Sequence, residues 1–306
     1  MNILEIVNMA RQDILYDTIL PYRWTDNYLL HCLIRAYDEL CKETKCIVDG
    51  TTTAVTEVPL LSNQSMYALH ASVVYIFSAR LESDGQPLVK KAESYMDLGF
   101  YGWRDTTGTP YMIIPDSASR YFSIYPKYNT TGYILGVSNI NFVVAAGPVY
   151  TITQAGATFT SHYTTGDEVA VTGTTSNNKT ITLTNVADTT LTTSTLLVAE
   201  AATSAKLQLV KDTALLRVAR KMVTRWVEND LAIATPPTPE IDVDLHYGLL
   251  DGIAKFAYLK QDADAYDPNA AQKHRDLFED FKSQIRFELA DLTTEQGVCT
   301  PHYGMY

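Results

Sequence analysis

Six histidines and several groups of aspartates are the residues of this chain that could support catalysis or metal binding. Histidine acts as a general base or a metal ligand, and aspartate as a base or a ligand for hard cations. The histidines are scattered, and none has a second type of ligand at metal-binding spacing. His246 and His274 have aspartates nearby, at or near the C-terminal helices. We interpret both as capping, core-edge or interface side chains.

The segment Asp262-x-Asp264-x-x-Asp267 begins like a calcium-binding loop. An EF-hand loop needs an oxygen ligand at its fifth position, glycine at its sixth and a bidentate glutamate at its twelfth. Here these positions hold Tyr266, Asp267 and Lys273. The spacing therefore favours a polar turn between two helices, in which Asp267 caps the second helix.

The four cysteines do not form a disulfide framework in a chain of this length. Cys41-x4-Cys46 has no second cysteine pair or paired histidine to complete the roughly four ligands of a zinc site, so we interpret both residues as small apolar helix residues. No GxSxG, HExxH, GxGxxG or P-loop pattern occurs. The sequence thus predicts no catalytic, cofactor-binding or metal-binding residues and favours a protein that is not an enzyme. A hydrolase using the C-terminal aspartates is a distant alternative.

The composition describes a folded, acidic protein of 306 residues, of which 46% are hydrophobic and 19% charged. The net charge of -11 argues against non-specific binding to the phosphate backbone of DNA, but it suits a surface past which DNA slides. No apolar run approaches the roughly 18 residues of a membrane span, and Glu5 lies where a signal peptide carries positive charge. We therefore expect a soluble protein made in a cytoplasm. Twenty tyrosines beside nine phenylalanines hint at surfaces that become interfaces.

Apolar residues at three- and four-residue spacing predict two antiparallel helices at the N-terminus, over residues 3–15 and from Thr25 or Asp26 to Thr44. Short β segments follow, with one short helix at 92–101 and a hairpin around the turn at Pro115-Asp116-Ser117. The other expected strands cover 55–60, 72–81 and 133–144. Residues 145–207 are rich in threonine and sparse in charge, which predicts an inserted all-β module.

The C-terminal part reads as helical after a stiff proline-rich linker at 235–239. One helix carries Leu245, Leu249 and Phe256, and a second begins at Pro268. Periodicity alone leaves 207–226 ambiguous between helix and strand. Residues 293–306 form a tail that is too interrupted by proline and glycine to continue a helix.

The order of these elements resembles the head-to-tail connector (adaptor) proteins of short-tailed bacteriophages. The resemblance is carried by residues on both sides of the insert: Gly108-Thr109-Pro110, Tyr125-Pro126, Pro239-Glu240-Ile241, His246, Leu249-Leu250, Ala254, Ala257, Asp262 to Asp267, Ala270, His274 and Phe278. It implies strand for much of 207–226. We therefore expect an α+β fold, with a helical core of two helix pairs, a small irregular β domain and the inserted all-β module. The core covers 1–144 and 208–292, the insert 145–207 and the tail 293–306.

The resemblance also implies a function and partners. It implies a structural virion protein of the neck, forming a dodecameric ring that joins the portal to the tail or nozzle protein, with no cofactor and no membrane. DNA would pass through the channel during genome ejection without specific binding, and assembly would occur in the host cytoplasm. An alternative from a different class is a tail-associated binding module whose β insert recognises a host receptor or carbohydrate.

The C-terminal tail is the one segment for which we predict a contact. Tyr303, Met305 and Tyr306 are apolar groups at a chain end, which suggests a segment that docks on a partner. In related adaptors this region reaches toward the portal, so the resemblance implies portal docking. A tail folded back on its own helices is the alternative.

Overall fold

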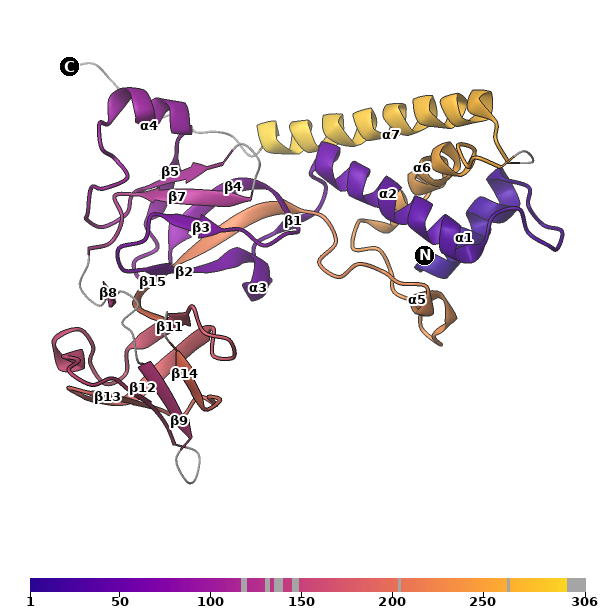
Figure 1. Cartoon of the computed structure of the whole chain (residues 1–306). Coiled ribbons are helices and arrows are strands. Elements are labelled where there is room, and N and C mark those ends of the chain that lie inside the picture. The colour runs from indigo at the N-terminus through magenta and orange to yellow at the C-terminus, as the bar shows by residue number, and fades with distance from the viewer. Residues whose placement is uncertain are drawn as a thin grey trace, which may run out of the picture. The chain divides into compact units, whose positions relative to one another are not determined.

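The chain divides into two compact units. The computed structural model describes residues 1–116, 120–129, 133–134, 140–144, 149–202, 205–262 and 265–295. The first unit comprises Met1–Asp49, Ala71–Tyr75 and Val218–Tyr306, and the second comprises Gly50–His70 and Ile76–Arg217. The first therefore gathers segments from both ends of the chain, and it holds helices α1, α2, α6 and α7 (Figure 1).

The N-terminal helix pair predicted from the sequence is confirmed. Helix α1 (Ile3–Met9) begins with a capping box between Asn2 and Glu5 and continues as a π-helical turn, η1 (Ala10–Ile14). Helix α2 (Asp26–Thr44) begins at Thr25, whose side chain accepts a hydrogen bond from the backbone N–H of Tyr28. It ends at Lys45, which adopts the left-handed conformation.

The two C-terminal helices also lie where the sequence placed them. Helix α6 (Gly248–Ala257) is followed by α7 (Pro268–Glu295), the longest helix of the described residues. The Asp267 carboxylate accepts hydrogen bonds from the backbone N–H groups of Asn269 and Ala270, so the predicted cap is confirmed. The remaining helices are short: α3 (Thr53–Thr56), α4 (Glu93–Gly99), η2 (Phe159–Ser161), α5 (Asn229–Ala232) and η3 (Val243–His246).

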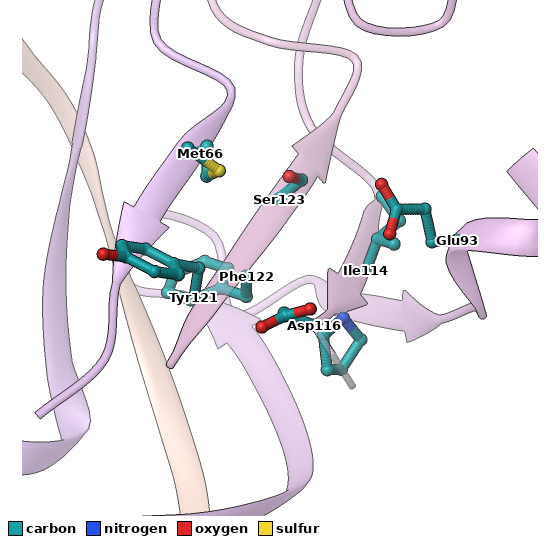
Figure 2. Close-up of a pocket in the computed structure, with 8 residues that line it drawn as sticks. Met66, Glu93, Ile114, Asp116, Tyr121, Phe122 and Ser123 are labelled. Carbon is teal, nitrogen blue, oxygen red and sulfur yellow. The ribbon is translucent and has the colours of Figure 1, made fainter. Parts of the chain in front are cut away.

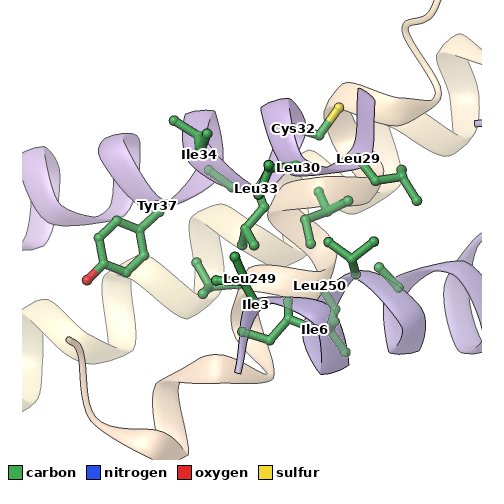
Figure 3. Close-up of a cluster of buried hydrophobic side chains, with 14 of the residues drawn as sticks. Ile3, Ile6, Leu29, Leu30, Cys32, Leu33, Ile34, Tyr37, Leu249 and Leu250 are labelled. Atoms are coloured by element: carbon green, nitrogen blue, oxygen red, sulfur yellow. The ribbon is translucent and has the colours of Figure 1, made fainter. Parts of the chain in front are cut away.

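One apolar core joins these helices in the first unit. Ile3 of α1, Leu33 of α2 and Leu249 of α6 are fully buried in it, as the close-up in Figure 3 shows. Phe278 of α7 completes the cluster. Full burial of each such side chain contributes about 1.5–3 kcal/mol, so the N-terminal and C-terminal segments stabilise one another.

Gly252 sets the distance between α2 and α6. A Cβ atom at this position would lie 2.6 Å from the Cβ of Ala36 and 3.1 Å from the ring of Phe278. Both helices must therefore separate to admit even one methyl group. We expect Gly252→Ala to destabilise the protein by about 1–3 kcal/mol, the usual cost of overpacking a core.

Thermal unfolding followed by the helical circular-dichroism signal measures this effect. Gly99→Ala is the matched control, because a Cβ at Gly99 meets nothing within 4 Å and the position ends α4. Its melting temperature is expected to stay the same or rise slightly. Equal melting temperatures for wild type and Gly252→Ala would show that the two helices can move apart at no cost.

A cluster of charged side chains lies beside this core, where α2, α6 and α7 meet. The Lys282 ammonium group is fully buried and donates hydrogen bonds to carboxylates of Glu39, Glu43 and Glu279 at 2.7–2.8 Å. Lys255 of α6 donates to the same Glu39 at 2.6 Å. Burial alone would raise the pKa of Glu39, but the hydrogen bonds from both lysines hold it below its ordinary value. The lysines therefore stabilise the ionised carboxylate.

The strands form a large mixed sheet. In the described residues fifteen strands are joined, mostly antiparallel, with β5 and β6 parallel. They are β1 (Val48–Asp49), β2 (Glu57–Leu61), β3 (Met66–Ala68), β4 (Val73–Leu81), β5 (Pro87–Lys90), β6 (Met112–Pro115), β7 (Tyr121–Tyr125), β8 (Tyr133–Ile134), β9 (Ile140–Val144), β10 (Tyr150–Thr153), β11 (Glu168–Thr172), β12 (Lys179–Ala187), β13 (Thr190–Thr193), β14 (Glu200–Ala202) and β15 (Lys206–Arg220). The hairpin β6–β7 was predicted and is confirmed.

The fold class predicted from the sequence, a helical core with a small irregular β domain, is wrong. The protein is mostly β, and β15 pairs both with strands that precede the insert and with strand β11 inside it. Leu61 of β2 lies opposite Val210, and Val169 of β11 lies opposite Leu209. Segments that look like separate short strands along the chain are thereby combined into one large sheet. The strand assignment of 207–226 is confirmed as far as Arg220.

The threonine-rich segment has an apolar cluster of its own. Phe159, Val171, Ile181 and Leu191 are buried in it, together with Ile140 from the preceding strand. Alternate residues of β12 face this cluster, as expected for a strand with one buried side. Whether residues 145–207 behave as a separable insert stays a prediction.

Candidate interaction surfaces

The loop between α1 and α2, residues 15–24, has a base made of buried charges. We call it the anchored loop. The Arg11 guanidinium donates to the Asp17 carboxylate at 2.9 Å, to the Trp24 carbonyl at 2.7 Å and to Asp26 at 2.5 Å. The Asp17 carboxylate also accepts the backbone N–H groups of Arg23 and Trp24. Both ends of the loop are therefore held by one buried ion pair whose hydrogen bonds are satisfied.

Further contacts attach the loop to α6. The Trp24 indole N–H donates to the Ala257 carbonyl at 2.9 Å, and the Tyr258 hydroxyl donates to the Ile14 carbonyl at 3.1 Å. The two rings meet edge to face, with centroids 5.8 Å apart. These contacts join the loop to the core of the first unit, so its base is rigid.

The exposed part of the anchored loop is apolar. Tyr16, Ile19 and Leu20 expose 78%, 81% and 73% of their surface, and Tyr22 is also exposed beside the Arg11 guanidinium. Tyr16 has a φ of +50°, a left-handed conformation that costs a residue with a side chain on the order of 1–3 kcal/mol. Large exposed apolar side chains of this kind are common at surfaces that bind other proteins.

The second unit has an apolar surface of its own at the end of α4. Leu98 is 91% exposed, Tyr101 is fully exposed and Tyr95 is half-exposed. Behind them the ring of Phe100 packs between those of Tyr95 and Tyr125. This surface, which we call the α4 tip, consists largely of the tyrosines that the composition singled out.

A pocket of about 210 Å³ lies beside β3, β6 and β7. Its walls combine the apolar side chains of Met66, Ile114 and Phe122 with the carboxylates of Glu93 and Asp116 (Figure 2). Glu93 forms an ion pair with Arg104, and each of these two side chains is about half exposed. Glu93 is therefore held in a solvated surface ion pair.

The two histidines considered from the sequence occupy separate places. His246 is fully buried, and its Nε2 lies 3.2 Å from the Ile241 carbonyl; burial lowers the pKa of this imidazole, which favours its neutral form. His274 contacts the Asp251 carboxylate through Nδ1 at 2.7 Å and stacks on Tyr258. These contacts of His274 join α7 to α6, which agrees with a role of this side chain in packing.

The remaining points concern metal binding, membrane spans and the predicted portal-docking residues. Among the described residues, no group of three histidine, cysteine, aspartate or glutamate side chains could hold a metal ion. Within the same residues, no helix is both long and apolar enough to cross a membrane. Tyr303, Met305 and Tyr306, the predicted portal-docking residues, lie outside the described residues.

The anchored loop is the surface that the sequence analysis missed. Most of its residues lie between the two predicted N-terminal helices, and no contact was predicted for them. A usable signal was present, because Ile19-Leu20-Pro21-Tyr22 is apolar where a connecting segment is expected to be polar.

Comparison with known proteins identifies the family of the chain. No curated protein matches this chain. The model of the SU10 adaptor protein family matches residues 1–298, on both sides of the insert and through it. Such a match over almost the whole chain supports a structural role as a phage adaptor and a place in the virion. The chain belongs to the SU10 adaptor protein family.

Proposed function

We propose that this adaptor forms a closed, dodecameric ring of identical subunits in the neck of a short-tailed phage. The ring joins the portal to the tail or nozzle protein, and DNA leaves through its channel during genome ejection. Assembly takes place in the host cytoplasm. The observation that carries this proposal is the anchored loop, an apolar group of side chains on a base of buried charges.

A loop of this kind suits a permanent contact between subunits or rings. Binding is weakened when flexible side chains and loops must be ordered, and a base held by Arg11 and Asp17 removes much of that cost. Contacts around a ring are heterologous, so one surface of each subunit must fit a different surface of the next. The anchored loop and the α4 tip are two different apolar surfaces on one chain.

The charge of the protein supports the passage of DNA. A net charge of -11 repels phosphate, and at physiological salt this repulsion acts over a Debye length of about 8 Å. DNA can then slide through a channel lined by such a protein without being retained. The proposed portal contact of the tail, through Tyr303, Met305 and Tyr306, belongs to the same assembly.

Leu20→Ser tests the loop directly. The side chain is 73% exposed, so the stability of the subunit is expected to change by less than about 0.5 kcal/mol. Loss of one large apolar anchor from an interface costs about 1.5–3 kcal/mol, which weakens association at least tenfold. Negative-stain imaging and light scattering of the protein mixed with its portal measure ring formation and docking.

Phe287→Ser is the matched control, because Phe287 of α7 is also 73% exposed but lies outside the loop. We expect Phe287→Ser and wild type to form rings and to dock on the portal. We expect Leu20→Ser to do neither. If Leu20→Ser forms normal rings, the anchored loop is not part of the interface. Wild-type protein that forms no ring with the portal would overturn the ring itself.

A further inference from the structure

The pocket beside β3, β6 and β7 has the composition of a site for a basic side chain. Its carboxylates belong to Glu93, the first residue of α4, and to Asp116, which follows β6. Figure 2 shows them around the same pocket as the apolar side chains of Met66 and Ile114. Of the eight described residues that line it, none is a lysine or arginine. A cation with an apolar stem would meet both opposite charge and apolar surface there.

The size and chemistry of the pocket suit one arginine side chain. Its volume of about 210 Å³ is below the roughly 300–1,000 Å³ of pockets that hold small molecules. Arg104 bridges Glu93 and Asp97, so one cation is shared by two carboxylates, and Asp116 adds a further negative charge at the pocket. A guanidinium group binds carboxylates through two hydrogen bonds and stacks on aromatic rings, and the ring of Tyr121 lines the pocket.

The anchored loop carries an arginine beside its apolar side chains. Arg23 is exposed, and its backbone N–H donates to the buried Asp17 carboxylate at 3.0 Å. The Arg23 carbonyl accepts a hydrogen bond from the Lys260 ammonium group at 2.6 Å. The backbone of Arg23 is therefore held in place before any partner binds, which reduces the entropic cost of docking.

The loop and the second unit are complementary in charge as well as in apolar surface. The loop exposes Ile19 and Leu20 beside the cation Arg23. The second unit exposes Leu98 and Tyr101 at the end of α4, and the acidic pocket lies at the start of the same helix. Each surface thus combines apolar side chains with a charge of opposite sign to the other, which favours pairing of the two.

We propose that Arg23 of one subunit enters the pocket of the neighbouring subunit, between Glu93 and Asp116, while the apolar part of the anchored loop packs on that neighbour's α4 tip. The inference rests on the ring proposed above and assigns two of its surfaces to one contact. The contact joins two different surfaces, so it is heterologous and can be repeated from each subunit to the next.

Reversal of either charge tests the contact. In Arg23→Glu the loop presents a carboxylate to an acidic pocket, and in Asp116→Lys an ammonium group meets the incoming guanidinium. Like charges oppose binding at an interface, so each variant alone is expected to associate at least about tenfold more weakly than wild type. Light scattering and negative-stain imaging of the full chain mixed with its portal measure association, after circular dichroism has verified the fold. Asp116→Asn is measured beside them, because loss of the charge should weaken association even if Asp116→Lys does not fold.

A mixture of Arg23→Glu and Asp116→Lys distinguishes a contact between subunits from one within a subunit. The reversed loop of the first variant can bind the reversed pocket of the second, and the unaltered loop of the second can bind the unaltered pocket of the first. We therefore expect rings in which the two variants alternate, although neither forms rings alone. Folded variants that fail to assemble when mixed would overturn the proposal.

Arg225→Glu and Glu168→Lys are the matched controls, because they reverse exposed charges outside both surfaces, before α5 and on β11. Both are expected to form rings as wild type does. Normal rings from Arg23→Glu or from Asp116→Asn would overturn this contact and leave the ring in place. Wild-type protein that forms no ring with the portal would overturn the ring, and this contact with it.

Discussion

Replacing Lys282 by methionine is expected to destabilise the helical unit by about 3 kcal/mol or more. Methionine retains much of the apolar stem but removes the ammonium group that donates to Glu39, Glu43 and Glu279. Among the described residues, Glu39 then keeps only Lys255 and Glu43 only Arg286 as cationic partners, and the buried cation that joined the three carboxylates is lost. Guanidinium unfolding followed by the helical circular-dichroism signal measures the loss.

Lys273→Met is the matched control, because Lys273 is an exposed lysine of the same helix and its removal changes the net charge equally. A change within about 0.5 kcal/mol is expected. The difference between the Lys282 variant and wild type should persist in high salt, because the Lys282 ammonium is fully buried. Equal losses for both lysines would mean that net charge, and not the cluster, determines the stability.

The pH dependence of this effect has a definite sign. The pKa of Glu39 is lowered in the folded protein, so its ionised form contributes stability that is present above the ordinary pKa of glutamate. This contribution is lost as the pH falls through the lowered value. The difference in the free energy of unfolding between wild type and Lys282→Met should therefore become smaller at acidic pH. If this difference stays constant down to a pH of about 3, the carboxylates are not its source.

Arg11→Met is expected to have the second large effect, a loss of about 3–5 kcal/mol. Arg11 and Asp17 are both almost fully buried, so removal of the guanidinium leaves a carboxylate in the protein without its cation. Methionine also cannot donate to the Trp24 carbonyl. The base of the anchored loop should open, which would be visible as proteolytic cleavage between α1 and α2 as well as in denaturant unfolding.

Arg104→Met provides the comparison, because the ion pair of Arg104 with Glu93 is about half exposed. Surface pairs contribute at most about 1 kcal/mol. Adding Asp17→Asn to Arg11→Met should recover part of the stability, since no unpaired charge then remains buried. If the double variant is less stable than Arg11→Met alone, the hydrogen bonds of Asp17 matter more than its charge.

Local signals in the sequence predicted the helices well. Thr25 and Asp267 are capping residues at the start of α2 and α7, and each acts through backbone groups within three residues. The hairpin β6–β7 was likewise predicted from a turn signal around Pro115, which the structure places at the end of β6. Such features depend on neighbours along the chain, which a sequence displays directly.

The sheet and the candidate surface depended on contacts between distant residues. The pairing of Leu61 with Val210 has no local signature, so the β region was predicted as small and separate. The anchored loop follows from the contact between Arg11 and Asp17 and from the attachment of Trp24 to Ala257. Neither contact can be deduced from periodicity, although the apolar Ile19-Leu20 pair was visible in the sequence.

The central place of β15 has a consequence for folding during synthesis. Translation adds about 5–20 residues per second, so β2 leaves the ribosome roughly 8–30 s before the residues of β15 that pair with it. Until then β2 has open backbone groups that could pair with another nascent chain. Pro59, in the middle of β2, has no backbone N–H and interrupts such pairing. The strand thus contains a safeguard against aggregation for the period before the sheet can close.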